Sequence, residues 1–185
     1  MDRRVVILSI LVSVAVLSWW WSQEGQMPVM GTTAPSAEET DYSFTGLVVS
    51  DMDPAGALVE TLSANRLSHY PDRGQSLLDS PQLVFYRGEV KAWDIVARNG
   101  VVQDTDRSAV LSGAVKVVYA GEAPGQGFDL YTDELQVWPD ARRAETDRAV
   151  RIVRPGAVIT STGMQANLDT RVITLLSQVQ GTYEP

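Results

Sequence analysis

The sequence predicts an all-β fold, an antiparallel β-jellyroll of repeated hairpins, preceded by one N-terminal transmembrane helix. Three observations lead to this expectation: a long apolar run near the N-terminus, a pattern that recurs four times, and a period-two alternation of apolar and polar residues between turn clusters. Together they divide the chain into a cytoplasmic start with the transmembrane helix (1–22), a flexible linker (23–41) and a β-jellyroll domain (42–185).

Residues 5–21 form the apolar run, which only three serines interrupt. Its 17 residues reach the lower end of the length that spans a bilayer core. Arg3 and Arg4 precede the run and the first charge after it is Glu24, so the positive-inside rule predicts a cytoplasmic N-terminus and an exported remainder. The alternative is a cleaved signal peptide, which needs small residues where this chain carries three tryptophans. Because tryptophans are typical of membrane interfaces, we favour an uncleaved anchor.

Residues 23–41 are rich in Gly, Pro, Ser, Thr and Ala and show no period. This composition is typical of a flexible coil, which would hold the following domain near the membrane.

The repeated pattern follows. Its first residues are 33, 35 and 34 positions apart in the segments Leu62-Ser63-Ala64, Ile95-Val96-Ala97, Leu130-Tyr131-Thr132 and Met164-Gln165-Ala166. After most copies a polar turn and a second apolar run follow, so the unit is two strands and a turn. Such units bury their apolar faces only by stacking on their neighbours.

Alternation indicates that each strand has one apolar and one wet face. Leu111, Gly113, Val115 and Val117 share one face, and so do Ile173, Leu175, Val179 and Tyr183. Gly, Pro, Asp and Asn cluster between the strands, as turns require. We therefore expect the sheet to roll with its apolar faces inward, V-shaped in section and not a closed barrel.

Composition excludes several classes of function. The chain has no cysteine and one histidine, so thiol chemistry and the usual zinc sites are excluded, and we expect no metal and no cofactor. A formal net charge of −8 without a basic stripe argues against a nucleic-acid partner.

Candidate catalytic residues do not assemble into a known constellation. His69 lacks a nucleophile elbow, and we expect it to be structural or solvated. The aspartate pairs Asp104/Asp106 and Asp129/Asp133 fall in turn-like or alternating positions and are expected to solvate edges. The glycine-rich segment 121–127 lacks the Lys and Ser/Thr of a phosphate-binding loop and is expected to be a hairpin loop. We therefore predict that the protein is not an enzyme.

The order of these features resembles the LptC family, the inner-membrane-anchored periplasmic component of the lipopolysaccharide export machinery. The resemblance covers essentially the whole chain, although no single motif is highly specific. It depends on the N-terminal span and on the order of the segments Asp53–Leu58, Leu62–Tyr70, Ser80–Leu83, Ala109–Val115, Ala144–Asp147, Ser161–Met164 and the terminus at Tyr183.

The resemblance implies a β-jellyroll in the periplasm, on a single-pass anchor in the bacterial inner membrane. It also implies that the protein receives lipopolysaccharide from an inner-membrane ABC transporter at its N-terminal edge. The lipid then passes to a soluble periplasmic β-jellyroll bridge protein at the C-terminal edge. Both joints would be strand additions. We expect the first joint at the strand 42–50 with the turn at Gly56, and the second at the strand 172–183, with Gly156 and Gly163 shaping the approach and Tyr183 at its end.

Candidate lipid-binding residues are the alternating apolar side chains of the predicted roll: Leu47, Val49, Leu58, Leu62, Leu78, Phe85, Ile95, Leu111, Val115, Leu130, Ile152, Ile173, Leu175 and Tyr183. Ordinary core packing is the alternative for each. We expect Leu47, Leu78, Ile173 and Tyr183 to be the most accessible, and Arg66, Arg98 and Arg151 to lie near the anionic head groups.

Two other functions remain open. The first is a membrane-anchored assembly protein that binds only protein edges and no lipid, and a filled interior would favour it. The second is a glycan-processing enzyme, which would need clustered carboxylates or aromatic platforms on one sheet face, whereas the exported aromatic residues are scattered.

Overall fold

The computed structural model describes residues 40–123 and 125–183. Contacts divide the chain into Met1–Ala37 and Glu38–Pro185, and all described residues belong to the second unit. The predicted transmembrane helix (1–22) and nearly all of the predicted linker (23–41) lie outside the described residues. Within residues 40–123 and 125–183, no helix is long and apolar enough to cross a membrane.

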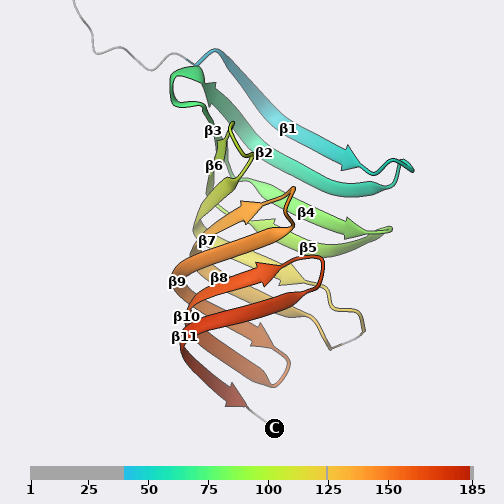
Figure 1. The fold of residues 1–185 in the computed structure, drawn as a ribbon, viewed down its shortest axis with the longest axis vertical. Coiled ribbons are helices and arrows are strands. Elements are labelled where there is room, and N and C mark those ends of the chain that lie inside the picture. The colour runs from blue at the N-terminus through green and yellow to red at the C-terminus, as the bar shows by residue number, and fades with distance from the viewer. Residues whose placement is uncertain (1–39, 124, 184–185) are drawn as a thin grey trace, which may run out of the picture. The chain divides into compact units, whose positions relative to one another are not determined.

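The described residues form one antiparallel sheet of 11 strands (Figure 1), which confirms the predicted all-β antiparallel class. A short 3-10 turn, η1 (Pro71–Arg73), lies between two of them. The strands are β1 (Tyr42–Met52), β2 (Leu58–Tyr70), β3 (Gln75–Asp79), β4 (Gln82–Arg87), β5 (Val90–Val96), β6 (Asn99–Gln103), β7 (Ala109–Tyr119), β8 (Phe128–Trp138), β9 (Arg143–Arg154), β10 (Ala157–Asn167) and β11 (Val172–Tyr183).

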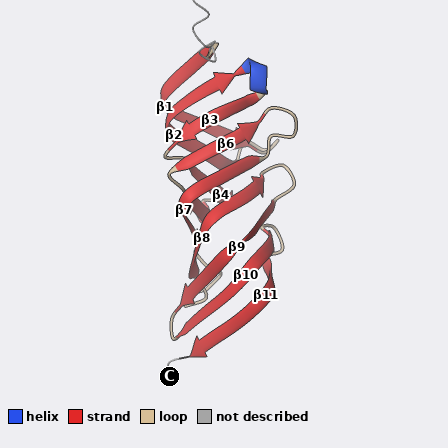
Figure 2. Ribbon diagram, turned by 90° about the vertical axis from the view of Figure 1, so that its left-hand side faces the viewer, coloured by secondary structure: helices blue, strands red, loops and turns tan. Residues whose placement is uncertain are grey.

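The sheet divides at β2 and joins again at β7. One part of β2 pairs with β4 and the other with β3, while β7 pairs with β6 through its first residues and with β5 through its last. We call the part that contains β3 and β6 half-sheet A and the part that contains β4 and β5 half-sheet B. The long strands run through both halves, and Figure 2 shows them following one another from β1 to β11.

The passage from one half-sheet to the other requires a corner in every long strand. Positive φ angles mark several corners: Gly46 (+64°) in β1, Gly113 (+80°) in β7, Gly163 (+78°) in β10 and Gln178 (+50°) in β11. The ladder register shifts at the corners of β7, β10 and β11, as a β-bulge produces. Between β3 and β4, and between β5 and β6, the corner interrupts the strand itself.

Hydroxyl groups satisfy backbone atoms where the corners break the ladder. Thr132 Oγ1 donates to the carbonyl of Glu134 at 3.3 Å, and Ser161 Oγ donates to that of Gly163 at 3.3 Å. The backbone N–H of Arg148 donates to Thr146 Oγ1 at 3.1 Å. These three hydroxyl side chains are buried in an otherwise apolar interior because the interrupted backbone needs partners there.

The repeat of about 34 residues corresponds to one hairpin of two bent strands. Leu62 lies in β2, Ile95 in β5, Leu130 in β8 and Met164 in β10. All four contribute to one apolar core, in which Leu62 is partly exposed and the other three are buried. Each hairpin therefore adds one layer to a core that continues through its neighbours.

Candidate functional site

Half-sheet B carries an uninterrupted apolar ladder on its inner face. Residues directly opposite each other on neighbouring strands point to the same side of a sheet. The strand pairings connect, in order, Val49, Leu62, Leu83, Ile95, Val117, Leu130, Ile152 and Ile159, which cross β1, β2, β4, β5, β7, β8, β9 and β10. The ladder ends at Gly181 of β11, which has no side chain.

Half-sheet A carries a second ladder, which is more mixed in polarity. Its members are Tyr42, His69, Ser76, Val102, Ala109, Val137, Ala144, Ala166 and Ile173. The alanines in the second half of this ladder leave room for the larger side chains of the ladder on half-sheet B. The interior is therefore apolar on the side of half-sheet B and mixed in polarity on the side of half-sheet A, where His69 and Ser76 belong to the ladder.

The interior is closed in the middle and open at both ends. Ile95, Leu111 and Leu130 each expose 1% of their surface, and the cavity between the half-sheets at this level holds about 10 Å³. At the β1 end Phe44 exposes 51% and Val49 50%, and at the β11 end Val179 exposes 54%. Most of the exposed apolar surface thus lies at the ends of the core, with Val90 and Tyr131 as exceptions on the middle strands.

The predicted lipid-binding residues fall into three groups along this gradient. Leu78, Phe85, Ile95, Leu111, Val115, Leu130 and Ile152 are buried; Leu47, Leu58, Leu62, Ile173 and Leu175 are half-buried; Val49 and Tyr183 are exposed. Leu78, which we expected among the most accessible, exposes only 3% because it packs within half-sheet A. Apart from Phe85 and Val115, which line surface pockets, the first group can touch a ligand only if the two halves move.

Sequence reasoning missed several residues of the interior. Leu47 and Val49 face inward, and strict alternation would then turn Phe44 outward. Phe44 also faces inward, because the corner at Gly46 shifts the alternation by one residue. Trp93 lies two residues before Ile95 on the same face, so its position was available from the alternation.

The two half-sheets also meet at their tips, which are the ends of the strands and the turns farthest from the corners. Three contacts there cross from one half-sheet to the other. Trp93 Nε1 of half-sheet B donates to the carbonyl of Leu168 in the β10–β11 turn at 3.1 Å. The Arg142 guanidinium, in the β8–β9 turn, lies 4.9 Å from the centre of the Phe85 ring and 3.9 Å from a carboxylate oxygen of Glu60. The third contact is an ion pair between Arg171 and Glu122.

A pocket of about 160 Å³ lies at these tips, and we call it the mouth. Arg87 also reaches it and binds Glu122 at 3.0 Å, so Glu122 holds two arginines. Burial raises the pKa of Glu60, although Arg142 opposes this shift. The lining residues are Phe85, Tyr86, Arg87, Ala92, Trp93, Arg142, Leu168, Asp169 and Arg171.

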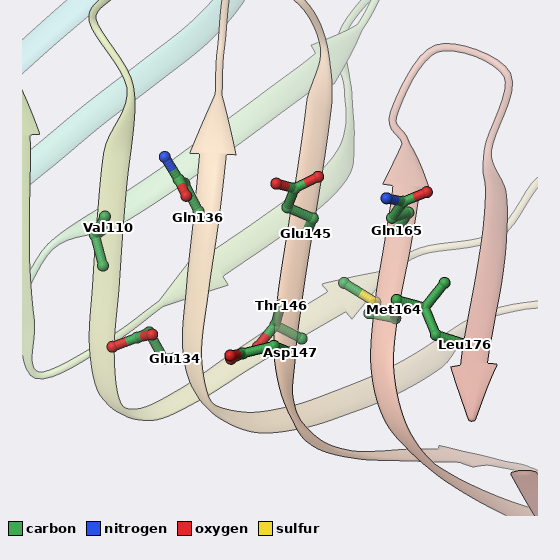
Figure 3. Close-up of a pocket in the computed structure, with 9 residues that line it drawn as sticks. All are labelled: Val110, Glu134, Gln136, Glu145, Thr146, Asp147, Met164, Gln165 and Leu176. Atoms are coloured by element: carbon green, nitrogen blue, oxygen red, sulfur yellow. The ribbon is translucent and has the colours of Figure 1, made fainter. Parts of the chain in front are cut away.

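A larger, shallow pocket of about 410 Å³ lies on the outer surface of half-sheet A (Figure 3). Glu134, Glu145 and Asp147 line it, and Arg148 makes ion pairs with Glu134 at 3.5 Å and with Asp147 at 3.3 Å. Its carboxylates make it unsuited to an acyl chain or an anionic head group.

His69 joins separate segments at the β1 end. Its Nδ1 lies 2.7 Å from Asp41 Oδ1, its Nε2 lies 2.9 Å from Asp104 Oδ2, and the Tyr42 ring stacks on it at 4.6 Å. The hydrogen bonds to Asp104 and to Asp41 raise the pKa of His69. The site therefore fastens the start of β1 to the β6–β7 turn.

Two further candidate aspartates, Asp106 and Asp129, have structural partners. Asp106 Oδ1 accepts from the backbone N–H of Ser108 at 3.0 Å, and this bond holds the pKa of Asp106 below its ordinary value. Asp129 binds Lys116 at 2.8 Å, which lowers the pKa of Asp129 and raises that of Lys116. Within residues 40–123 and 125–183, no group of three or more metal-ligating side chains converges.

The sheet has two free edges. β1 pairs only with β2, and β11 pairs only with β10, among the described residues. Gly56 lies in the exposed β1–β2 turn, Gly156 in the exposed β9–β10 turn, and Gly163 is buried at the corner of β10, next to Leu176 of β11. Free edges of this kind accept a further strand.

Comparison with known proteins agrees with this architecture. A family model described as "LptC: Lipopolysaccharide-assembly, LptC-related" matches residues 6–184. A search of curated proteins found no match. Among solved structures, the chain is similar to LptH from Pseudomonas aeruginosa, described as the LptA homologous periplasmic component of the conserved lipopolysaccharide transport device. The likeness has a TM-score of 0.53 at 8% identity, covers 68% of this chain and 95% of LptH, and concerns the fold alone.

Proposed function

This chain belongs to the LptC family of lipopolysaccharide-assembly proteins, and from that premise we propose that it is a non-enzymatic carrier of lipopolysaccharide. In this proposal the lipid comes from an inner-membrane ABC transporter and passes to a soluble periplasmic β-jellyroll protein, so that this β-jellyroll is one part of a bridge across the periplasm. The observation that carries the proposal is the apolar ladder from Val49 to Ile159, which continues through eight strands without a polar side chain.

An interior of this kind can hold acyl chains but cannot drive their movement. Burying an acyl chain is worth about 0.8 kcal/mol per CH₂ group, and the bilayer supplies the same amount. Transfer into the roll is therefore nearly neutral, and the energy for export must come from the transporter's ATPase.

The free edges and the exposed apolar ends fit partners that continue the same roll. We assign β1, with the turn at Gly56, to the transporter side, and β11, with Tyr183, Gly156 and Gly163, to the soluble partner. A strand added to either edge would satisfy its unpaired backbone groups and extend the ladder. The anchor in residues 1–22 would hold the protein in the inner membrane, with the β-jellyroll domain in the periplasm.

The second candidate function is an assembly protein that binds only protein edges. The tight packing around Ile95, Leu111 and Leu130, with a cavity of about 10 Å³, favours it. The two functions differ in whether lipid reaches the inner face.

Site-specific photo-crosslinking in cells separates these functions. A photoreactive amino acid at Leu47 or Leu175, on the inner face at either end, is expected to capture lipopolysaccharide. The matched controls are the adjacent outward positions, Val48 and Thr174, which should capture none. Capture of protein partners alone at all four positions would support the edge-only function and contradict the carrier.

A further inference from the structure

We propose that the mouth is a recognition site for the phosphorylated head of an acylated lipid, with Arg87 and Arg171 as its principal phosphate ligands. This inference rests on the proposed carrier function and adds the part of the lipid that the apolar interior does not explain.

The mouth borders the apolar interior. Trp93 and Leu168 line both the mouth and the small cavity between the half-sheets, and Phe85 belongs to the core and to the mouth. A lipid whose acyl chains enter the interior from this side therefore has its polar head among the arginines.

At the mouth, two arginines share a single carboxylate as their ion-pair partner. Glu122 is shared by two guanidinium groups, so one carboxylate balances two positive charges. Arg142 faces Glu60 at 3.9 Å, close to the limit of an ion pair, and burial raises the pKa of that carboxyl. Asp169 also lines the mouth and opposes anion binding.

A phosphate group can replace Glu122 between Arg87 and Arg171. Guanidinium groups bind phosphate through two parallel hydrogen bonds, and such charge-assisted bonds are stronger than neutral ones. The side chain of Glu122 is 54% exposed and that of Arg87 50%, so solvent reaches this ion pair and an incoming anion can displace the carboxylate. The 160 Å³ of the mouth gives room for the phosphate.

The arginines that the sequence suggested for this role lie elsewhere. Arg66 and Arg98 are exposed at corners, and Arg151 is exposed on the outer side of β9, where it pairs with Thr160. Arg87, Arg142 and Arg171 come together only because the tips of the two half-sheets meet, which no local pattern reveals.

The test compares lipid A, the acylated and phosphorylated disaccharide of lipopolysaccharide, with the same lipid after enzymatic dephosphorylation. Binding to the full-length protein in detergent is measured by displacement of a fluorescent lipid. The wild type is expected to prefer the phosphorylated form by about tenfold or more, as one or two charged hydrogen bonds provide. R87Q/R171Q should lose this preference and still bind the dephosphorylated lipid as the wild type does. E122Q should increase the preference, because it removes the competing carboxylate.

Other outcomes separate the possible errors. If neither lipid binds, the carrier function itself fails. If both lipids bind equally to the wild type, or if R66Q/R98Q and not R87Q/R171Q removes the preference, the carrier stands and the mouth is not the head-group site. Inorganic phosphate alone should bind far more weakly than lipid A, and equal binding would indicate a free-anion site and overturn the assignment to a lipid head.

Discussion

His69 shows how one residue can fasten an edge strand. β1 has a neighbour on one side only, and its inner side chains Tyr42 and Phe44 are about half exposed. The hydrogen bonds of His69 to Asp41 and Asp104 compensate for this shortage of packing by tying the start of β1 to the β6–β7 turn.

This fastening should depend on pH. The two carboxylates raise the pKa of His69 above its ordinary value of 6.5, so the protonated ring is favoured in the folded state. When folding raises the pKa of a group, that group stabilises the folded state fully at pH values below its pKa in the unfolded chain. The stabilisation is lost as the pH rises through the pKa in the folded state. Hydrogen-exchange protection of residues 42–45 is therefore expected to fall as the pH rises above the ordinary value of 6.5.

H69Q should have low protection in this segment at every pH. The amides of β10 serve as the internal control, since they lie far along the sheet from His69. If the protection of β1 and the protection of β10 in the wild type respond to pH in the same way, the role of His69 is contradicted.

At the scale of the element, the bent strand is the unit of construction, and its corner decides which side chains face inward. Gly163 illustrates the requirement. Its φ of +78° favours glycine, and an added Cβ would lie 3.0 Å from Cδ1 of Leu176. The corner therefore holds β10 and β11 at a separation that a larger residue would not allow.

Gly163→Ala is expected to destabilise the β unit by about 1–3 kcal/mol, the range for a residue held in an unfavourable backbone conformation. Gly181→Ala is the matched control, because Gly181 lies in β11, has no positive φ, and an added Cβ there would have no neighbour within 4 Å. The measurement is chemical denaturation of the full-length protein followed by circular dichroism. Equal loss of stability in the two variants would show that the corner is not the cause.

The sequence was sufficient for the class of fold and for much of the apolar interior. The repeat led to the hairpin unit, and all four of its apolar first residues, from Leu62 to Met164, contribute to the core. Alternation was insufficient at corners, where the set of inward-facing residues changes parity: Phe44 was missed because the corner at Gly46 separates it from Leu47 and Val49. The mouth was beyond prediction because its three arginines lie far apart in the chain: Arg87 at the end of β4, Arg142 in the β8–β9 turn and Arg171 in the β10–β11 turn.

At the scale of the molecule, the important property is the difference between the closed middle and the open ends of the interior. Leu47 and Leu175 are half-buried near the ends, whereas Ile95 and Leu130 become accessible only if the half-sheets separate. The cross-gap contacts of Trp93, Arg142 and Arg171 oppose that separation.

A covalent link across the mouth tests whether separation is needed for transport. Because the natural chain has no cysteine, the E122C/R171C variant carries the only two thiols, and a short bis-maleimide joins the β7–β8 loop to the β10–β11 turn. We expect the linked protein to lose lipid capture by a photoreactive residue at Leu130, because that residue exposes 1% of its surface in the closed form. Capture at Leu175 should persist, and so should docking of the soluble partner, since β11 keeps its free edge. The same variant before linking controls for the lost Glu122 and Arg171 side chains. If the linked protein still captures lipid at Leu130, the acyl chains enter from the ends of the roll, and the mouth need not open.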